Sequence, residues 1–230
     1  VVWIEVSDEQ EEESDVAMQA THADWVHQGE DNAGNRLLSP YHGKGVLLGI
    51  IDSGFEFNHM ANCADEGMGD TRIKYISFSA DEVYSTPSAI NYFLSTNTND
   101  RTDSSHGQHV LGIAAGTIID GYGGTADQAD IALGVGNTRT NMVANIQNIA
   151  KFAHDNNQPC VISMSLGNKL GGHDGTNVIA QAIDEVVQQY GILYTISCGN
   201  YGSYKTSIAK DFTQSSKSVA TLVRPTTAST

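Results

Sequence analysis

The sequence predicts an α/β protein in which a mostly parallel β-sheet is flanked by helices. Short apolar runs, typical of strands that are buried on both faces, lie at residues 46–51, 131–135, 160–164 and 192–197. Two intervening segments place their apolar side chains on one helical face, at residues 142–153 and 178–187. Strands that alternate with helices need crossover connections, and such connections give parallel pairing.

Three short segments precede the first apolar run. The pattern predicts a strand at 1–6 (VVWIEV), a solvated linker at 7–15 with six acidic side chains, and a short helix at 16–28. Because the alternating pattern starts only after them, we expect residues 1–28 to be an N-terminal extension. The main domain is then expected at residues 29–230.

The remaining segments are less regular. The composition of residues 29–45 predicts a loop. Residues 62–103 are polar, and we expect an irregular, loop-rich region there. Residues 217–223 predict one further strand.

Composition excludes several classes of protein. The formal net charge is −15, which argues against nucleic acid as a partner because phosphates require clustered Lys and Arg. No apolar run approaches the roughly 18 residues of a membrane span. Cys63, Cys160 and Cys198 are an odd number of cysteines without CxxC spacing, so they predict neither a zinc site nor a disulfide framework. We interpret them as small buried hydrophobes.

Chemistry in open parallel sheets gathers beyond the carboxyl ends of the strands. Asp52 follows one predicted strand and is either a turn-forming residue or a carboxylate that orients an imidazole. Asn200 follows another and is either a turn residue or an amide donor to an oxyanion. Residues 165–167 are either an ordinary strand exit or an edge that pairs with an extended peptide.

Two histidines open a predicted helix within the stretch SSHGQHVLGIAAG, at residues 104–116. A helical metal pair commonly has two His four residues apart with a Glu between them, whereas His106 and His109 are three apart without a Glu. A metal site is therefore not favoured here. His109 is expected to lie about a turn away and to point toward packing.

Four motifs together resemble the subtilisin-like serine proteases (subtilases, peptidase family S8). In the order of that family they are IIDSG at 50–54, HGQHVLGIAAG at 106–116, ISMSLG at 162–167 and SCGN at 197–200. The resemblance covers residues 44–202 and implies a three-layer αβα fold. The family usually has Thr where Gln108 stands, Ala where Leu111 stands, and two Ala where Ser197 and Cys198 stand.

The resemblance also implies roles for individual residues. Asp52 would orient the imidazole, His106 would be the general base and acid, and Asn200 would donate to the oxyanion. The cleft that binds the substrate would be lined by Ser165, Leu166, Gly167, Cys198 and Gly199. Polypeptides are the implied substrates, and no metal or organic cofactor is required. Structural calcium fits the family, but no ligand motif for it stands out.

The serine nucleophile of the family lies in a Gly-Thr-Ser-Met-Ala motif that follows the oxyanion Asn, and residues 201–230 contain no such motif. Ser229 lacks the preceding Gly, and Gly175-Thr176-Asn177 has no hydroxyl at its third position. We expect a serine endopeptidase whose domain is incomplete at its C-terminus, so that this part alone is inactive. The alternative is a catalytically dead module that binds peptides.

The N-terminus suggests processing. The first residue is Val and no signal peptide is visible, so we expect a processed form. Residues 1–28 are interpreted as the tail of a propeptide or as a species-specific extension. The implied partners are therefore polypeptide substrates, the protein's own propeptide and its missing C-terminal segment. The resemblance implies a secreted or cell-envelope location.

Overall fold

The structure is a computed structural model of the 230-residue chain, and it describes residues 13–36, 39–65, 69–96, 105–167 and 174–200. The chain divides into two compact units, Val1–Gly199 and Asn200–Thr230. All elements described below belong to the first unit. The strands predicted at 1–6 and 217–223 lie outside the described residues.

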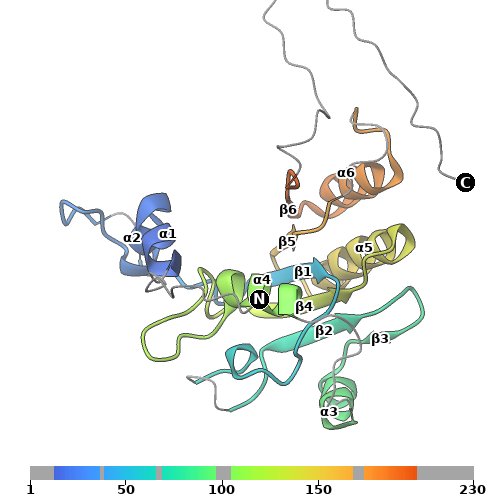
Figure 1. The fold of residues 1–230 in the computed structure, drawn as a ribbon, viewed down its shortest axis with the longest axis horizontal. Coiled ribbons are helices and arrows are strands. Elements are labelled where there is room, and N and C mark those ends of the chain that lie inside the picture. The colour runs from blue at the N-terminus through green and yellow to red at the C-terminus, as the bar shows by residue number, and fades with distance from the viewer. Residues whose placement is uncertain (1–12, 37–38, 66–68, 97–104, 168–173, 201–230) are drawn as a thin grey trace, which may run out of the picture. The chain divides into compact units, whose positions relative to one another are not determined.

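A six-stranded sheet forms the centre of the first unit, with the strand order β3-β2-β4-β1-β5-β6 (Figure 1). Its strands are β1 (Leu47–Asp52), β2 (Ile73–Ser77), β3 (Val83–Tyr84), β4 (Asp130–Val135), β5 (Cys160–Met164) and β6 (Leu193–Ile196). Every neighbouring pair is parallel except β2 and β3. The four predicted strands are therefore present, within one residue of their expected ends. The expectation that all four are buried on both faces is wrong for β6, which lies at the edge of the described sheet and is mostly exposed.

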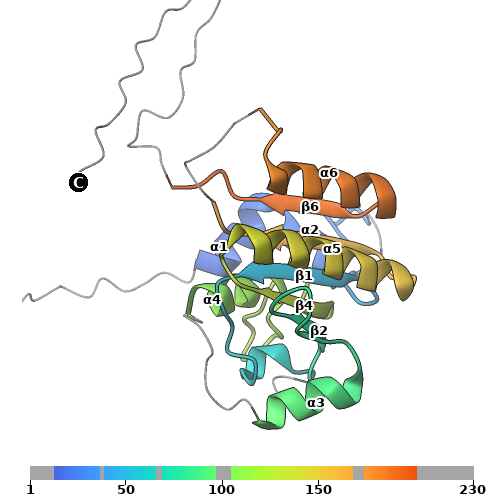
Figure 2. The ribbon, with the colours of Figure 1, turned by 90° about the vertical axis from the view of Figure 1, so that its right-hand side faces the viewer.

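Helices cover both faces of this sheet. The predicted helices α5 (Arg139–Asp155) and α6 (Val178–Tyr190) lie side by side on one face (Figures 1 and 2). The other face packs against α3 (Pro87–Thr96) and α4 (Ser105–Ala115). Two hydrophobic clusters result, one on each side of the sheet, which is the expected three-layer α/β arrangement.

Strand β1 shows how the two faces are separated. Leu47 and Ile51 belong to the cluster on the α5 side, while Leu48 and Ile50 belong to the cluster on the α4 side. Successive side chains of a strand point to opposite faces, so even-numbered residues of β1 point toward α4. Gly49 lets α5 approach, because a Cβ there would lie 2.9 Å from Ile149 Cγ2.

The expectation that residues 62–103 form irregular loops is wrong. This segment contains β2, β3 and α3. Strand β2 (IKYIS) is only five residues long, and Lys74 interrupts its apolar run because that position alone is exposed. Helix α3 buries just Ile90 and Phe93, a spacing of three residues, and begins at Pro87. A proline at the first helical position was a signal that could have located it.

The N-terminal segment also differs from the expectation. The predicted helix 16–28 is two helices, α1 (Glu13–Thr21) and α2 (Ala23–Gln28), separated at His22, which has a left-handed backbone with φ of 59°. Residues 13–15, expected in the linker, are already helical. Gly29 ends α2 with φ of 73°, a conformation that glycine adopts without steric cost.

The cysteines do not share one environment. Cys160 is buried in β5, as expected, and burial raises the pKa of its thiol to about 12. Cys63 is half-buried. Cys198 is exposed, so the expectation of a buried hydrophobe is wrong there, because the residue lies beyond the end of β6 and outside the sheet.

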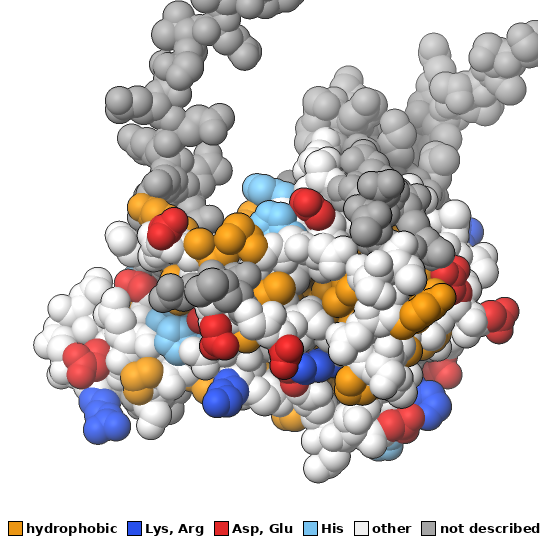
Figure 3. All heavy atoms as spheres, turned by 90° about the horizontal axis from the view of Figure 1, so that it is seen from below, with side chains coloured by type: hydrophobic (Ala, Val, Ile, Leu, Met, Phe, Trp, Pro, Cys, Tyr) orange, Lys and Arg blue, Asp and Glu red, His pale blue; other side chains and the backbone are white. Residues whose placement is uncertain are grey.

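Charges are dispersed over the surface. On the face shown in Figure 3, Lys and Arg side chains are scattered among Asp and Glu. One ion pair among the described residues joins Lys151 Nζ and Asp155 Oδ2, which lie 2.5 Å apart. Among the residues described, no helix has both the length and the apolar character needed to cross a membrane.

Candidate active site

The strand order defines where a binding crevice is expected. Strands β1 and β5 are neighbours in the sheet, but the chain leaves them in opposite directions. After β1 it continues to β2, toward the β3 edge, and after β5 it continues to β6, at the opposite edge. Ligands of open α/β sheets bind at such a reversal, beyond the carboxyl ends of the strands. Ile51 pairs with Met164, so Asp52 and Ser165 leave the sheet at this same edge.

Asp52 is the last residue of β1 and is fully buried. The alternation of β1 directs it to the same side as Leu48 and Ile50, toward α4. Its Oδ1 accepts hydrogen bonds from Ser53 N at 2.7 Å and Ser53 Oγ at 3.2 Å. A buried carboxylate is costly unless it is hydrogen-bonded and paired with positive charge, so Asp52 is suited to stabilise a cation beside it.

His106 is the residue that lies beside this carboxylate. Its Nδ1 is 2.9 Å from Asp52 Oδ1 and 3.0 Å from Oδ2, and its side chain is 55% exposed. An ionised carboxylate can only accept, so Nδ1 carries the proton and Nε2 is the nitrogen with a free lone pair in the neutral ring. The sequence predicts this hydrogen-bonded contact, and the geometry suits an oriented general base.

Gly107 allows helix α4 to approach the end of β1. A Cβ at this position would lie 2.0 Å from Gly54 O and 3.0 Å from Asp52 Cβ. Both separations are too short for a side chain, so His106 reaches the carboxylate only because its neighbour has none.

A buried amide pair holds the first turn of α4. Gln108 Nε2 donates to Asn62 Oδ1 at 3.1 Å, and Asn62 Nδ2 donates to Glu56 O at 3.0 Å. Asn62 ends the short 3-10 helix η1 (Met60–Asn62), which follows the turn after β1. The Gln that replaces the usual Thr of the family therefore fastens the helix to this turn.

The expectation that His109 packs inside the protein is wrong, because this side chain is exposed. The buried stripe of α4 is formed by Gln108, Leu111 and Ala115, at spacings of three and four residues. His109 points away from that stripe, because on the helical wheel it is turned by about 100° from Gln108, the nearest of its members. The spacing of the apolar residues was the signal that could have shown this.

The predicted substrate-binding segments lie beside one another. Ser197 N donates to Met164 O at 3.1 Å, and a Cβ on Gly167 would be 3.7 Å from Gly199 Cα. Ser165 and Leu166 are half-buried, whereas Gly167, Cys198 and Gly199 are exposed. Their role in binding stays a prediction.

Asn200 is the first residue of the second compact unit and is exposed. Its convergence with Asp52 and His106 therefore stays a prediction.

Comparison with known proteins identifies the family. The model of the Subtilase family (Peptidase_S8) matches residues 43–226, which is most of the chain. The chain belongs to the subtilase family. The match includes Asp52, His106 and Asn200, and it begins after helices α1 and α2.

Two relatives in this family are much longer than the part of them that this chain matches. Tripeptidyl-peptidase 2 of Drosophila melanogaster is 30% identical over 108 residues, which are 43% of this chain and 7% of that protein. The CspB protease of Clostridium perfringens has a similar structure, with a TM-score of 0.64 and 25% identity over 80% of this chain and 40% of that chain. The chain thus spans less than half of the length of either relative.

Proposed function

We propose that this protein is a subtilisin-type serine endopeptidase that hydrolyses peptide bonds of polypeptides. The observation that carries the proposal is the hydrogen bond from His106 Nδ1 to the fully buried Asp52, at the strand reversal between β1 and β5. A base oriented in this way activates a nucleophile, and membership of the subtilase family makes a serine the expected nucleophile.

The mechanism begins with proton transfer. His106 Nε2 takes the proton of the serine hydroxyl as its oxygen attacks the scissile carbonyl carbon, and Asp52 stabilises the resulting imidazolium. The Asn200 amide donates to the oxyanion of the tetrahedral intermediate, a contact worth about 3 kcal/mol of barrier in enzymes of this type. The imidazolium then returns its proton to the leaving amine as the tetrahedral intermediate collapses to an acyl-enzyme ester. His106 next takes a proton from a water molecule, which attacks this ester, releases the carboxylic acid product and regenerates the serine. Residues 165–167 and 198–199 hold the extended substrate backbone.

A peptide-binding module without catalysis is the second candidate, because these 230 residues contain no Gly-Thr-Ser motif. Such a module would keep the crevice and lack the acyl-enzyme step. The proposed peptidase, in contrast, would take its nucleophile from another segment of the full protein.

The test uses the full-length protein with a serine-directed fluorophosphonate probe and casein as substrate. We expect covalent labelling and proteolysis in the wild type. His106→Ala and Asp52→Asn should each reduce turnover by about 10⁴-fold or more, because the first removes the base and the second holds the ring in the wrong tautomer.

His109→Ala is the matched control, because this histidine lies three residues away on the same helix and is exposed. It should keep full labelling. A wild-type protein that folds and binds peptides without labelling would establish the binding module instead.

Three further properties belong to the same proposal. Residues 1–28 would be the tail of a propeptide, and the mature enzyme would be secreted or held in the cell envelope, with structural calcium allowed but not required. N-terminal sequencing of the active enzyme tests the first point. Val1 at the N-terminus of the active form would contradict it.

A further inference from the structure

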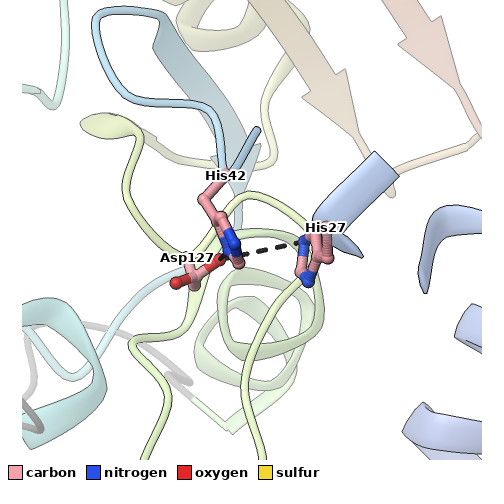
Figure 4. A group of neighbouring side chains, drawn as sticks. All are labelled: His27, His42 and Asp127. Carbon is pink, nitrogen blue, oxygen red and sulfur yellow. Dashed lines mark hydrogen bonds and ion pairs between the residues drawn. The ribbon is translucent and has the colours of Figure 1, made fainter. Parts of the chain in front are cut away.

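A second group of titratable side chains lies away from the candidate active site. His27, His42 and Asp127 offer ligand atoms that all lie within 4.8 Å of one another (Figure 4). His42 Nδ1 is 2.7 Å from Asp127 Oδ1, and His27 Nε2 is 3.8 Å from the same oxygen. The two imidazole rings are 4.2 Å apart between centroids.

The three residues come from separate segments that the backbone ties together. His27 belongs to α2, His42 precedes β1, and Asp127 precedes β4. His42 O accepts from Gln128 N at 2.9 Å, next to Asp127. Gly43 follows His42 and has φ of 84°. It lies so close to the segment before β4 that a Cβ on it would be 3.0 Å from Ala126 Cβ.

A third backbone contact brings in the helix, because Val26 O, beside His27, accepts from Tyr41 N at 3.0 Å. The cluster is thus held by its backbone and does not depend on one flexible side chain.

We propose that His27, His42 and Asp127 bind a divalent transition-metal ion, with Zn²⁺ the best fit. Two imidazoles and one carboxylate form a known zinc ligand set, in which a fourth position is left for water. Tetrahedral zinc with ligands at 2.0–2.1 Å separates its ligand atoms by about 3.3 Å. The distances from Asp127 Oδ1 to the two imidazole nitrogens, 2.7 and 3.8 Å, lie on either side of this value, and all three ligand atoms lie within 4.8 Å of one another.

Occupancy requires a proton shift within each neutral ring. His42 Nδ1 now interacts with Asp127 and His27 Nε2 with Thr125 O at 2.7 Å. Each of these nitrogens must release its present hydrogen bond and transfer its proton to the other nitrogen of the ring before its lone pair can bind metal, and this change of tautomer leaves the ring charge unchanged. Asp127 is only 6% exposed, so a cation beside it also stabilises a buried carboxylate. Calcium fits less well, because it prefers oxygen ligands.

The position of the cluster indicates a structural role. His42 and Asp127 precede the amino ends of β1 and β4, whereas Asp52 lies at the carboxyl end of β1. The two ends of this six-residue strand are roughly 17 Å apart. A bound metal would cross-link α2 to two loops of the peptidase domain. In the form that still carries residues 1–28, it would stabilise the attachment of the N-terminal segment and take no part in the chemistry at His106.

The test titrates the purified full-length protein with Zn²⁺, and with Co²⁺ as a spectroscopic probe. We expect one ion per chain at this site and visible Co²⁺ absorption typical of a tetrahedral site with nitrogen ligands. Free Zn²⁺ at 100 times its Kd should raise the Tm by roughly 5–10 °C. Ca²⁺ should not produce this shift through the same residues.

Three variants assign the site. His27→Gln, His42→Gln and Asp127→Asn should each weaken Zn²⁺ binding by about 100-fold while circular dichroism verifies folding. His22→Asn is the matched control, because His22 is exposed beside the same helix and Asn also accepts its left-handed backbone. No binding by the wild type, or equal binding by the folded Asp127→Asn protein, would overturn the proposal and leave a metal-free hydrogen-bonded cluster.

Discussion

The pair of Asp52 and His106 depends on a neighbouring residue that has no side chain. Gly107 follows the histidine directly, and its Cα faces Gly54 O and the Asp52 side chain. The hydrogen bond of 2.9 Å between His106 Nδ1 and Asp52 Oδ1 therefore requires contact between a helix start and a strand end. An added methyl group would separate the two elements.

We predict that Gly107→Ala lowers both stability and activity. The new Cβ would lie 2.0 Å from Gly54 O, so α4 must move, and overpacking of this kind costs about 1–3 kcal/mol. A displacement of about 1 Å of the base can cost ~10²-fold in rate. Thermal unfolding and casein turnover of the full-length protein would measure the two effects.

Gly112→Ala is the control for this prediction. It lies on the same helix, and a Cβ added there would meet no neighbouring atom within 4 Å. The substitution should therefore keep activity and gain about 0.5–1 kcal/mol from helix propensity. If both substitutions reduced activity equally, the contact at Gly54 would not be what positions His106.

Helix α4 is the element that carries the base, and its far end is held by Arg72. This guanidinium is only 8% exposed, and burial lowers its pKa. It donates to Ala115 O at the last residue of α4, to Ala129 O at 2.8 Å and to Ala61 O at 3.1 Å. A cation at a helix C-terminus also interacts favourably with the helix dipole.

We predict that Arg72→Met destabilises the protein by about 2–4 kcal/mol, because Ala115 O and Ala129 O both lose this buried donor. Lys74→Met is the control two residues away, since its ammonium is exposed and lies 3.9 Å from Asp130 Oδ1. It should change stability by less than about 0.5 kcal/mol. Urea unfolding of both variants compares them, and equal effects would show that Arg72 does not fasten the helix.

Across the whole molecule, the net negative charge opposes self-association, whereas exposed apolar side chains favour it. The formal net charge of −15 keeps copies of the chain apart. Strand β6, at one edge of the described sheet, leaves Leu193 68% exposed and Ile196 51% exposed. An exposed apolar edge strand favours association with another chain.

We predict that residues 1–230 self-associate as salt rises from about 0.1 to 1 M, because screening shortens the range of repulsion from roughly 10 to 3 Å. Leu193→Lys should reduce the association. Tyr92→Lys, at a residue of α3 that is 67% exposed, should not. Sedimentation velocity measures the effect, and unchanged association of Leu193→Lys would exclude β6 as the contact.

The sequence by itself determined the α/β class, four strands, the helices α4, α5 and α6, and the subtilase family. Strands β1 and β4 are buried almost throughout, so their apolar runs are continuous. The apolar residues of α5 and α6 recur at helical spacing, which marks one face of each helix. The Asp52–His106 contact was also predictable, because both residues lie in family motifs and carboxyl ends of parallel strands meet at one edge.

Only the tertiary structure decided the remaining features. Strand β2 and helix α3 have short, interrupted apolar patterns, so their burial depends on neighbours distant in the chain. His27, His42 and Asp127 lie in no common motif, and Asp127 is 85 residues from His42. The contact of His42 with Asp127 follows from the pairing of β1 with β4, which places the segments before both strands side by side. His27 joins them because α2 is held by the hydrogen bond from Tyr41 N to Val26 O. Local sequence reports which side chains can be buried, whereas the fold alone determines which of them meet.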